Sequence, residues 1–283
     1  MLGSVRSPTG PSAVSRPRRP FLDFNFPTGV AGLLVGTVVG MTGVGGGALM
    51  TPILVLLFGV APTTAVGTDL LYASVTKVAG TAVHHSHGTV DWQIVRRLAT
   101  GSLPAAALTL LWMHAHGEAG IRGGVIIVAL GVALAVTALG ILLKDRLHAL
   151  GTRLRIGHGA GFKAVQPALT VLAGALLGMM VTLTSVGAGA LGTVMLVYLY
   201  PLRLGAGRLV GTDLAHAIPL TLIAGIGHLT LGNVNLGLML NLLMGSIPGV
   251  MAGSFISTRA PMQPVRYAIA VVLLFVSYRM IVH

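Results

Sequence analysis

The chain carries one five-residue string twice, as Val66-Gly67-Thr68-Asp69-Leu70 and as Val210-Gly211-Thr212-Asp213-Leu214. From position 66 to position 210 the offset is 144 residues, and other positions match at the same offset. These further matches are His84 with His228, and Gly101-Ser102-Leu103-Pro104 with Gly245-Ser246-Ile247-Pro248. Apolar segments match by chance, whereas Gly, Thr, Asp, His and Pro in one register do not. The sequence therefore predicts an internal duplication.

A second repeated block lies upstream of this string in each half. The stretch Thr42-Gly43-Val44-Gly45-Gly46-Gly47-Ala48 matches Thr184-Ser185-Val186-Gly187-Ala188-Gly189-Ala190, from 42 to 184 and hence at an offset of 142. A two-residue insertion therefore separates the two blocks in the second half. With four membrane-spanning segments in each half, the repeats have the same orientation and are related by an axis along the membrane normal.

Composition indicates a membrane protein. Hydrophobic residues make up 54% of 283 positions and charged residues only 8%, against about 25% charged in an average soluble domain. A soluble protein of this size lacks the charges to cover its surface, whereas lipid requires none. We expect an all-α integral membrane protein with about eight transmembrane helices in two four-helix repeats. The expected spans are 27–58, 62–84, 93–113, 121–143, 166–200, 206–228, 236–256 and 265–282. Cysteine is absent, which excludes disulfides and thiolate metal sites.

The basic residues divide and orient the chain. We expect a disordered basic cytoplasmic tail at 1–26, membrane repeat 1 at 27–143, a basic cytoplasmic linker at 144–165 and membrane repeat 2 at 166–283. If 27–58 crosses once, the side that carries most Lys and Arg holds both termini and the linker. The positive-inside rule places that side in the cytoplasm. It also accounts for the net charge of +12 without nucleic-acid binding.

The first span of each repeat is expected to be broken. Residues 27–58 as one straight helix would measure about 48 Å, against a hydrocarbon core of about 30 Å, and glycines lie at the centre. Helix ends at membrane depth present free N–H groups and a partial positive charge, which suit an anion. We expect the substrate to be held by the two breaks, at Thr42, Gly43, Gly45, Gly46, Gly47, Thr184, Ser185, Gly187 and Gly189. Alternatively, these glycines only allow tight helix packing.

Three charged residues lie within apolar spans. Asp69 and Asp213 occupy the same repeat position, and intramembrane carboxylates are costly and usually functional. We expect them to couple transport to protons, although each alternatively caps a helix or pairs with a neighbour, such as Arg208 for Asp213. Lys77 is the cation well inside a span, and its repeat mate is Thr221. Lys77 is expected either to bind an anionic substrate or to neutralise Asp69.

The cluster His84-His85-Ser86-His87 invites a metal interpretation. No Cys, nearby Glu or HExxH pattern accompanies it, and among these histidines only His84 is repeated, as His228. A gating or helix-end role for His84 and His228 is therefore expected, with a divalent metal cation permease as the alternative. A membrane enzyme or assembly factor is a further rival, but an enzyme would concentrate its polar residues in one half. We expect no enzymatic activity and no cofactor.

The run from Val66 to Lys77, followed by His84-His85 and by Gly88-Thr89-Val90-Asp91-Trp92, resembles the TauE/SafE family of sulfite and organosulfonate permeases. The glycine cluster with Pro52, and Gly245-Ser246-Ile247-Pro248-Gly249, fit the same pattern. The resemblance covers about residues 28–282. It implies transport of small sulfur-containing or related organic anions across the bacterial inner membrane. In the second half Ser185 to Gly189 replaces the glycine triplet, and Val194 stands where Pro52 stands in the first. The oligomeric state stays open between a monomer and a homodimer.

Overall fold

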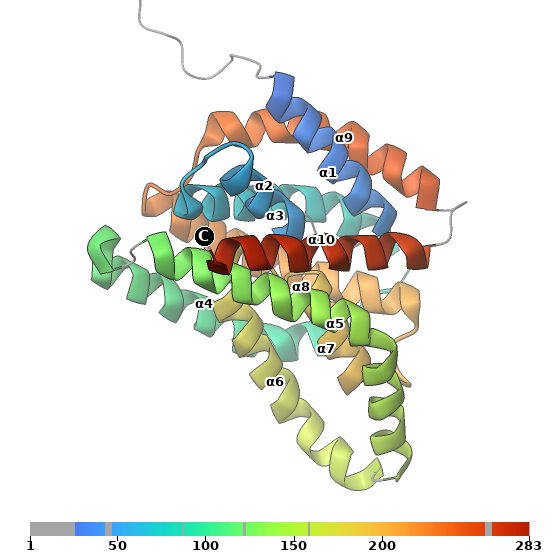
Figure 1. The fold of residues 1–283 in the computed structure, drawn as a ribbon. Helices are drawn as coiled ribbons and strands as arrows, with labels where there is room; N and C mark the ends of the chain where they lie inside the picture. Colours follow the sequence, from blue (N-terminus) through green and yellow to red (C-terminus); the bar gives the residue numbers. More distant parts are fainter. Residues whose placement is uncertain are drawn as a thin grey trace, which may run out of the picture.

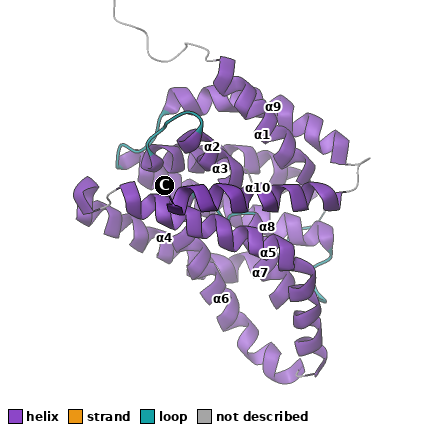
Figure 2. Ribbon diagram, in the orientation of Figure 1, coloured by secondary structure: helices purple, strands orange, loops and turns teal. Residues whose placement is uncertain are grey.

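The structure is a computed structural model that describes residues 26–42, 47–86, 88–120, 123–157, 159–257 and 262–282. These residues form ten helices and no strand (Figure 2). The helices are α1 (Phe26–Thr42), α2 (Gly47–Leu56), α3 (Pro62–Ser86), α4 (Trp92–Gly120), α5 (Gly123–Gly157), α6 (Gly159–Thr184), α7 (Ala190–Leu199), α8 (Ala206–Thr230), α9 (Leu236–Ser257) and α10 (Met262–Val282). The expectation of an all-helical protein is confirmed.

Six of these helices are long and apolar enough to cross a membrane, namely α4, α5, α6, α8, α9 and α10. The helices α1 and α7 are apolar but shorter than a bilayer span requires. Although α3 has 25 residues, it is not among the six, and it carries both Asp69 and Lys77 within its length.

The long apolar segment of the second half is divided, because α6 ends at Thr184 and α7 begins at Ala190. Between them Ser185 has a φ of 58°, Gly187 of 113° and Gly189 of 141°. Gly187 and Gly189 adopt this left-handed region without the clash that a Cβ would cause. In the first half α1 ends at Thr42 and α2 begins at Gly47, while 43–46 lie outside the described residues.

Helices of the N-terminal half pack mainly on helices of the C-terminal half. The closest partners are α1 with α9, α4 with α6, α3 with α8, and α5 with α10. Figure 1 shows α1 beside α9 at the top of the molecule and α10 running along α5 at the front. A Cβ at Gly101 would collide with the carbonyl oxygen of Val171, and one at Gly245 with that of Gly29. Small residues let the helices approach this closely.

Hydrogen bonds between the halves also occur at matching positions. The Thr68 hydroxyl accepts a bond from the backbone N–H of Asn235, and the Thr212 hydroxyl accepts one from the N–H of Asp91, each at 3.0 Å. The offset is 144 both from 68 to 212 and from 91 to 235. The threonine of each Gly-Thr-Asp string therefore holds the turn before α9 or α4 of the opposite half. The same two bonds make α3 and α8 antiparallel, because the start of each helix lies beside the turn that follows the other. The expectation of repeats in the same orientation is therefore wrong: the two halves have inverted orientation.

The basic segment 144–165 is helical in almost all of its described length. Helix α5 continues through it to Gly157, and α6 begins at Gly159. At 35 residues, α5 is about 52 Å long, so it exceeds the hydrocarbon core. The Leu, Ala, Lys and Arg residues of this stretch are good helix formers, which explains why the helix does not stop where the charges begin.

Candidate functional site

Lys77 reaches from α3 into the break between α6 and α7. Its side chain is only 5% exposed, and its Nζ donates a hydrogen bond of 2.6 Å to the carbonyl oxygen of Ala188. That carbonyl belongs to the segment in which the helical hydrogen bonds are interrupted. The lysine of one half therefore lies against the helix break of the other half, which local sequence pattern does not reveal.

Asp69 lies about two turns before Lys77 on α3 and is fully buried. One carboxylate oxygen, Oδ2, accepts a hydrogen bond of 2.7 Å from the Thr51 hydroxyl of α2. The Ser185 side chain, from the α6–α7 break, interacts with the same carboxylate. Within the described residues, however, neither Asp69 Oδ1 nor Ser185 Oγ has a hydrogen-bond partner of good geometry. Two buried oxygens therefore retain unused bonding capacity at the break.

Asp213, on α8, is the repeat mate of Asp69 and is also buried. It interacts electrostatically with Lys77 and with Lys144 of α5. Its carboxylate lies against the first turn of α7, because a Cβ at Gly192 would collide with Asp213 Oδ1. A carboxylate therefore occupies the neighbourhood of a helix N-terminus, where the free N–H groups and the helix dipole favour negative charge.

Lys77 connects the two carboxylates of the duplicated string. It interacts electrostatically with Asp213 and with Asp69, so that one buried cation faces an acid from each half. The structure thereby brings together Lys77, Asp69, Asp213 and Ser185, four of the residues that the sequence singled out. The prediction that Lys77 neutralises Asp69 describes part of this arrangement, since Asp213 is also its partner.

A buried pair at the same level was missed by sequence reasoning. The hydroxyl of Ser102 on α4 and Nε2 of His216 on α8 are 2.8 Å apart, and His216 also interacts electrostatically with Lys77. At the repeat-related positions, Ser246 of α9 lies near Tyr72 of α3, but Ser246 Oγ has no hydrogen-bond partner of good geometry among the described residues. The signal was present, because the serines belong to the repeated Gly-Ser-x-Pro blocks and His216 follows Asp213 by three residues.

The other predicted residues are distributed around the breaks. The Thr184 hydroxyl accepts a hydrogen bond of 3.1 Å from the N–H of Val186 and so supports the turn at the end of α6. Gly187 and Gly189 lie in the break itself. Thr42 ends α1 and Gly47 begins α2, while Gly43, Gly45 and Gly46 lie outside the described residues.

The histidines do not form a metal centre in the described part of the chain, where no group of three or more metal-ligating side chains occurs. His228 is buried, and its Nε2 is 2.9 Å from the carbonyl oxygen of Thr182 on α6. His228 therefore lies in the last turn of α8 and contacts α6 there. The side chains of His84 and His85, and all of His87, lie outside the described residues.

Comparisons with known proteins agree with a membrane protein. A family model described as sulfite exporter TauE/SafE matches residues 28–280. A probable membrane transporter protein of Bacillus subtilis (strain 168), YjnA, is 40% identical over 257 residues, which cover 88% of this chain and 97% of the relative. A second probable membrane transporter protein of the same organism, YdhB, is 26% identical over 241 residues, which cover 83% of this chain and 91% of the relative. No solved structure matches the chain. The chain belongs to the TauE/SafE family of membrane transporters.

Proposed function

We propose that the protein is a secondary transporter for small sulfur-containing or organic anions, such as sulfite or sulfonates, in the bacterial inner membrane. The observation that carries the proposal is Lys77, a buried cation at a helix break that interacts with both repeated carboxylates. Buried ionisable residues in membrane segments mark substrate and proton pathways. The name of the matching family, sulfite exporter TauE/SafE, supports a sulfur-containing anion as the substrate.

The charges of the cluster account for coupling between protons and an anion. Lys77 and Lys144 supply two positive charges, and Asp69 and Asp213 supply two negative charges. Uptake of one proton by a carboxylate leaves a net charge of +1, which a monovalent anion neutralises. The proton and the anion therefore enter a low-dielectric site together at a smaller cost than either does alone.

The breaks supply the remaining contacts. We place the anion at the N-terminal end of α7, where the helix dipole favours negative charge and Asp213 lies beside Gly192, and within reach of Lys77. Thr184, Ser185, Gly187 and Gly189 belong to this half of the site. Thr42, Gly43, Gly45, Gly46 and Gly47 form its counterpart in the first half. Backbone donors and one ammonium suit an oxyanion better than a metal cation.

The same proposal includes the architecture. Each of the two repeats contains a broken apolar segment, α1 with α2 and α6 with α7. Matching contacts at positions 142 and 144 residues apart support the duplication, and the antiparallel packing of α3 on α8 favours repeats of inverted orientation. The Gln166 amide at the start of α6 donates to the Leu199 carbonyl at the end of α7, which favours a segment that turns back over one that crosses once. The basic segment 144–165 then lies on the side opposite to both termini, and the positive-inside rule favours the cytoplasm for this segment.

Solute uptake into proteoliposomes tests the proposed function. We expect saturable uptake of sulfite or a sulfonate, driven by a proton gradient, and no uptake of Ni²⁺. Lys77→Ala should weaken anion affinity by about tenfold or more, the loss expected of a charge-assisted contact. Arg279→Ala, which removes an exposed cation at the end of α10, is the control. Ni²⁺ uptake without anion uptake would instead support the metal permease based on His84–His87.

A further inference from the structure

A basic cavity of about 270 Å³ lies far along the chain from Lys77, at the ends of α5 and α6. Its lining residues are Arg155, Lys163, Gln166, Tyr200, Pro201, Leu202 and Arg203. Three of these are cations and none is an acid. The volume is several times the ~30 Å³ that one water molecule occupies in the liquid, so a phosphate group fits.

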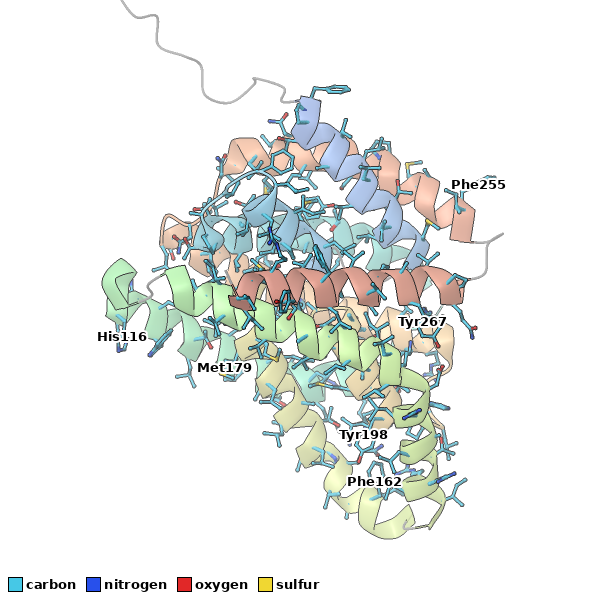
Figure 3. All side chains as sticks on the ribbon, in the orientation of Figure 1. His116, Phe162, Met179, Tyr198, Phe255 and Tyr267 are labelled. Carbon is cyan, nitrogen blue, oxygen red and sulfur yellow. The ribbon has the colours of Figure 1, made fainter. Side chains whose placement is uncertain are left out.

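The cavity walls are held by specific contacts. A Cβ at Gly151 of α5 would collide with the backbone carbonyl of Tyr198 on α7, so α5 and α7 are in contact. Phe162 and Tyr198 pack edge to face with ring centroids 6.4 Å apart (Figure 3). The Tyr200 hydroxyl lies 2.8 Å from the Thr170 hydroxyl and accepts a bond from Arg97. The cavity is therefore a built feature between α5, α6 and the turn after α7.

Arg203 has an acidic partner, whereas one nitrogen of Arg155 has no hydrogen-bond partner among the described residues. Arg203 is held by Asp91 through two hydrogen bonds of 2.7 and 2.9 Å, so Asp91 offsets its charge. Arg155 carries an Nη1 that is excluded from water and lacks a hydrogen-bond partner among the described residues. A buried charged donor without a partner is costly. An anion in the cavity would lie beside the Arg155 guanidinium, whose charge no described acid pairs, and Lys163 at the exposed rim would add a second charge.

The position of the cavity favours a lipid as the source of the anion. Lys163 lies at the start of the apolar helix Gly161–Thr184, which is the depth of the headgroups, and Arg155 lies in the basic part of α5 that follows its apolar residues. Leu202, which lines the cavity, is 65% exposed, and Ile156, the residue after Arg155, is 73% exposed. Exposed apolar side chains next to a cationic pocket match a phosphate joined to acyl chains.

We propose that this cavity binds a phosphate group, supplied by the headgroup of an anionic phospholipid, with Arg155 as its central donor. The site is separate from the transport cluster and does not depend on the substrate of the transporter. Guanidinium groups suit it because their planar fork pairs with two phosphate oxygens at once.

Native mass spectrometry of the purified full-length protein, after delipidation in a neutral detergent, tests the site. Titrations with phosphatidylglycerol, with phosphatidylcholine and with inorganic phosphate are compared. We expect phosphatidylglycerol to bind, and Arg155→Gln to weaken it by about tenfold, the loss of one charge-assisted bond. Arg153→Gln removes the same charge two residues away on an exposed face of α5 and should change binding less than twofold.

Each outcome decides the proposal. Arg155-dependent binding of inorganic phosphate would support the site with free phosphate as its source. Equal losses in Arg155→Gln and Arg153→Gln would overturn it, because binding would then reflect general charge attraction. So would equal retention of phosphatidylglycerol and phosphatidylcholine by all variants. If Arg155→Gln does not fold, Lys163→Gln at the exposed rim provides the same comparison with Arg153→Gln, and an unchanged affinity would count against the site.

Discussion

Lys77 and Thr221 occupy equivalent positions in the two halves and behave differently. Lys77 bonds across the molecule to Ala188, whereas the Thr221 hydroxyl bonds to the carbonyl of Ala217 in its own helix at 2.8 Å. Each half contributes one of the two carboxylates, but the cation that faces them, Lys77, comes from the first half alone. At the residue scale the site is therefore asymmetric, which favours one anion at a time rather than two equivalent sites.

The first prediction concerns proton coupling. Asp69→Asn and Asp213→Asn should insert and fold, because an amide of similar size replaces each carboxylate. Proton-linked uptake should fall by about tenfold or more in at least one of them, the factor that ~1.4 kcal/mol produces. Transport assays with and without a pH gradient measure this, and Asp145→Asn, an exposed acid on α5, is the control. Full proton-driven activity in both variants would leave only a helix-capping role.

The second prediction uses the contact between Gly192 and Asp213. Gly192→Ala places a methyl group where Asp213 Oδ1 lies, so the carboxylate must move from the start of α7. We expect a loss of stability of about 1–3 kcal/mol, as for other overpacked positions, and reduced transport. Thermal unfolding in detergent measures the first effect. In Gly207→Ala the nearest atom would be Thr89 Cγ2 at 3.9 Å, so that variant should melt at or above the wild-type temperature.

At the scale of elements, the breaks divide two long apolar segments into helix pairs. The α6–α7 break presents Ala188 to Lys77 and Ser185 to Asp69, so it is where the secondary structure and the charges of the site meet. Irregular backbone at membrane depth is tolerated where it is buried in protein or lines a cavity. All described residues from Thr184 to Leu191 are buried, which agrees with the first of these conditions.

The third prediction tests the break directly. Gly187→Leu requires a leucine at a φ of 113°, a region that side chains rarely adopt. The break should distort, and substrate binding should be lost while the protein stays in the membrane. Gly45→Leu is predicted to do more harm, because the glycine content is higher there. Binding to purified protein measures both variants, with Gly124→Leu, where the added Cβ meets nothing within 4 Å, as the control. Wild-type affinity in Gly45→Leu would place the site elsewhere.

At the scale of the whole molecule, the halves interlock instead of lying side by side. Helix α1, the first of its half, packs on α9, and α6, the first of the other half, packs on α4. Both α4 and α9 directly follow the helix that carries the Gly-Thr-Asp string. Helices α3 and α8, which carry the duplicated strings, pack on each other. A movement of one half relative to the other must therefore change the surroundings of Lys77, which is what alternating access to a central site requires.

The fourth prediction concerns orientation. A reporter fusion after Gly157 should report the cytoplasm, because the positive-inside rule places the basic segment 144–165 there. A fusion after His283 should report the periplasm, because inverted repeats put the chain end on the opposite side. Paired cytoplasmic and periplasmic reporters at each position provide the measurement. The same signal at both positions would contradict repeats of inverted orientation.

The helix ends were predictable to within a few residues in much of the chain. The expected spans 62–84, 206–228 and 236–256 correspond to α3, α8 and α9, because polar and turn-forming residues interrupt the apolar runs. The break at Ser185–Gly189 was also predicted, since an apolar segment too long for one span contains glycines at its centre. The continuation of α5 to Gly157 was not anticipated. The charged residues after Leu143 do not end the helix, because Lys and Arg are good helix formers.

The amino-acid sequence by itself determined the membrane class, the register of the duplication and the family, because composition and the order of rare polar residues are local properties. Only the tertiary structure decided that Lys77 meets Ala188, which is 111 residues away, and that His216 meets Ser102. In a soluble helix, polar residues mark the outer face and so predict which side packs inward. In lipid both faces are apolar, so helix pairing is set by close backbone approach at small residues, and periodicity does not encode which helices come together.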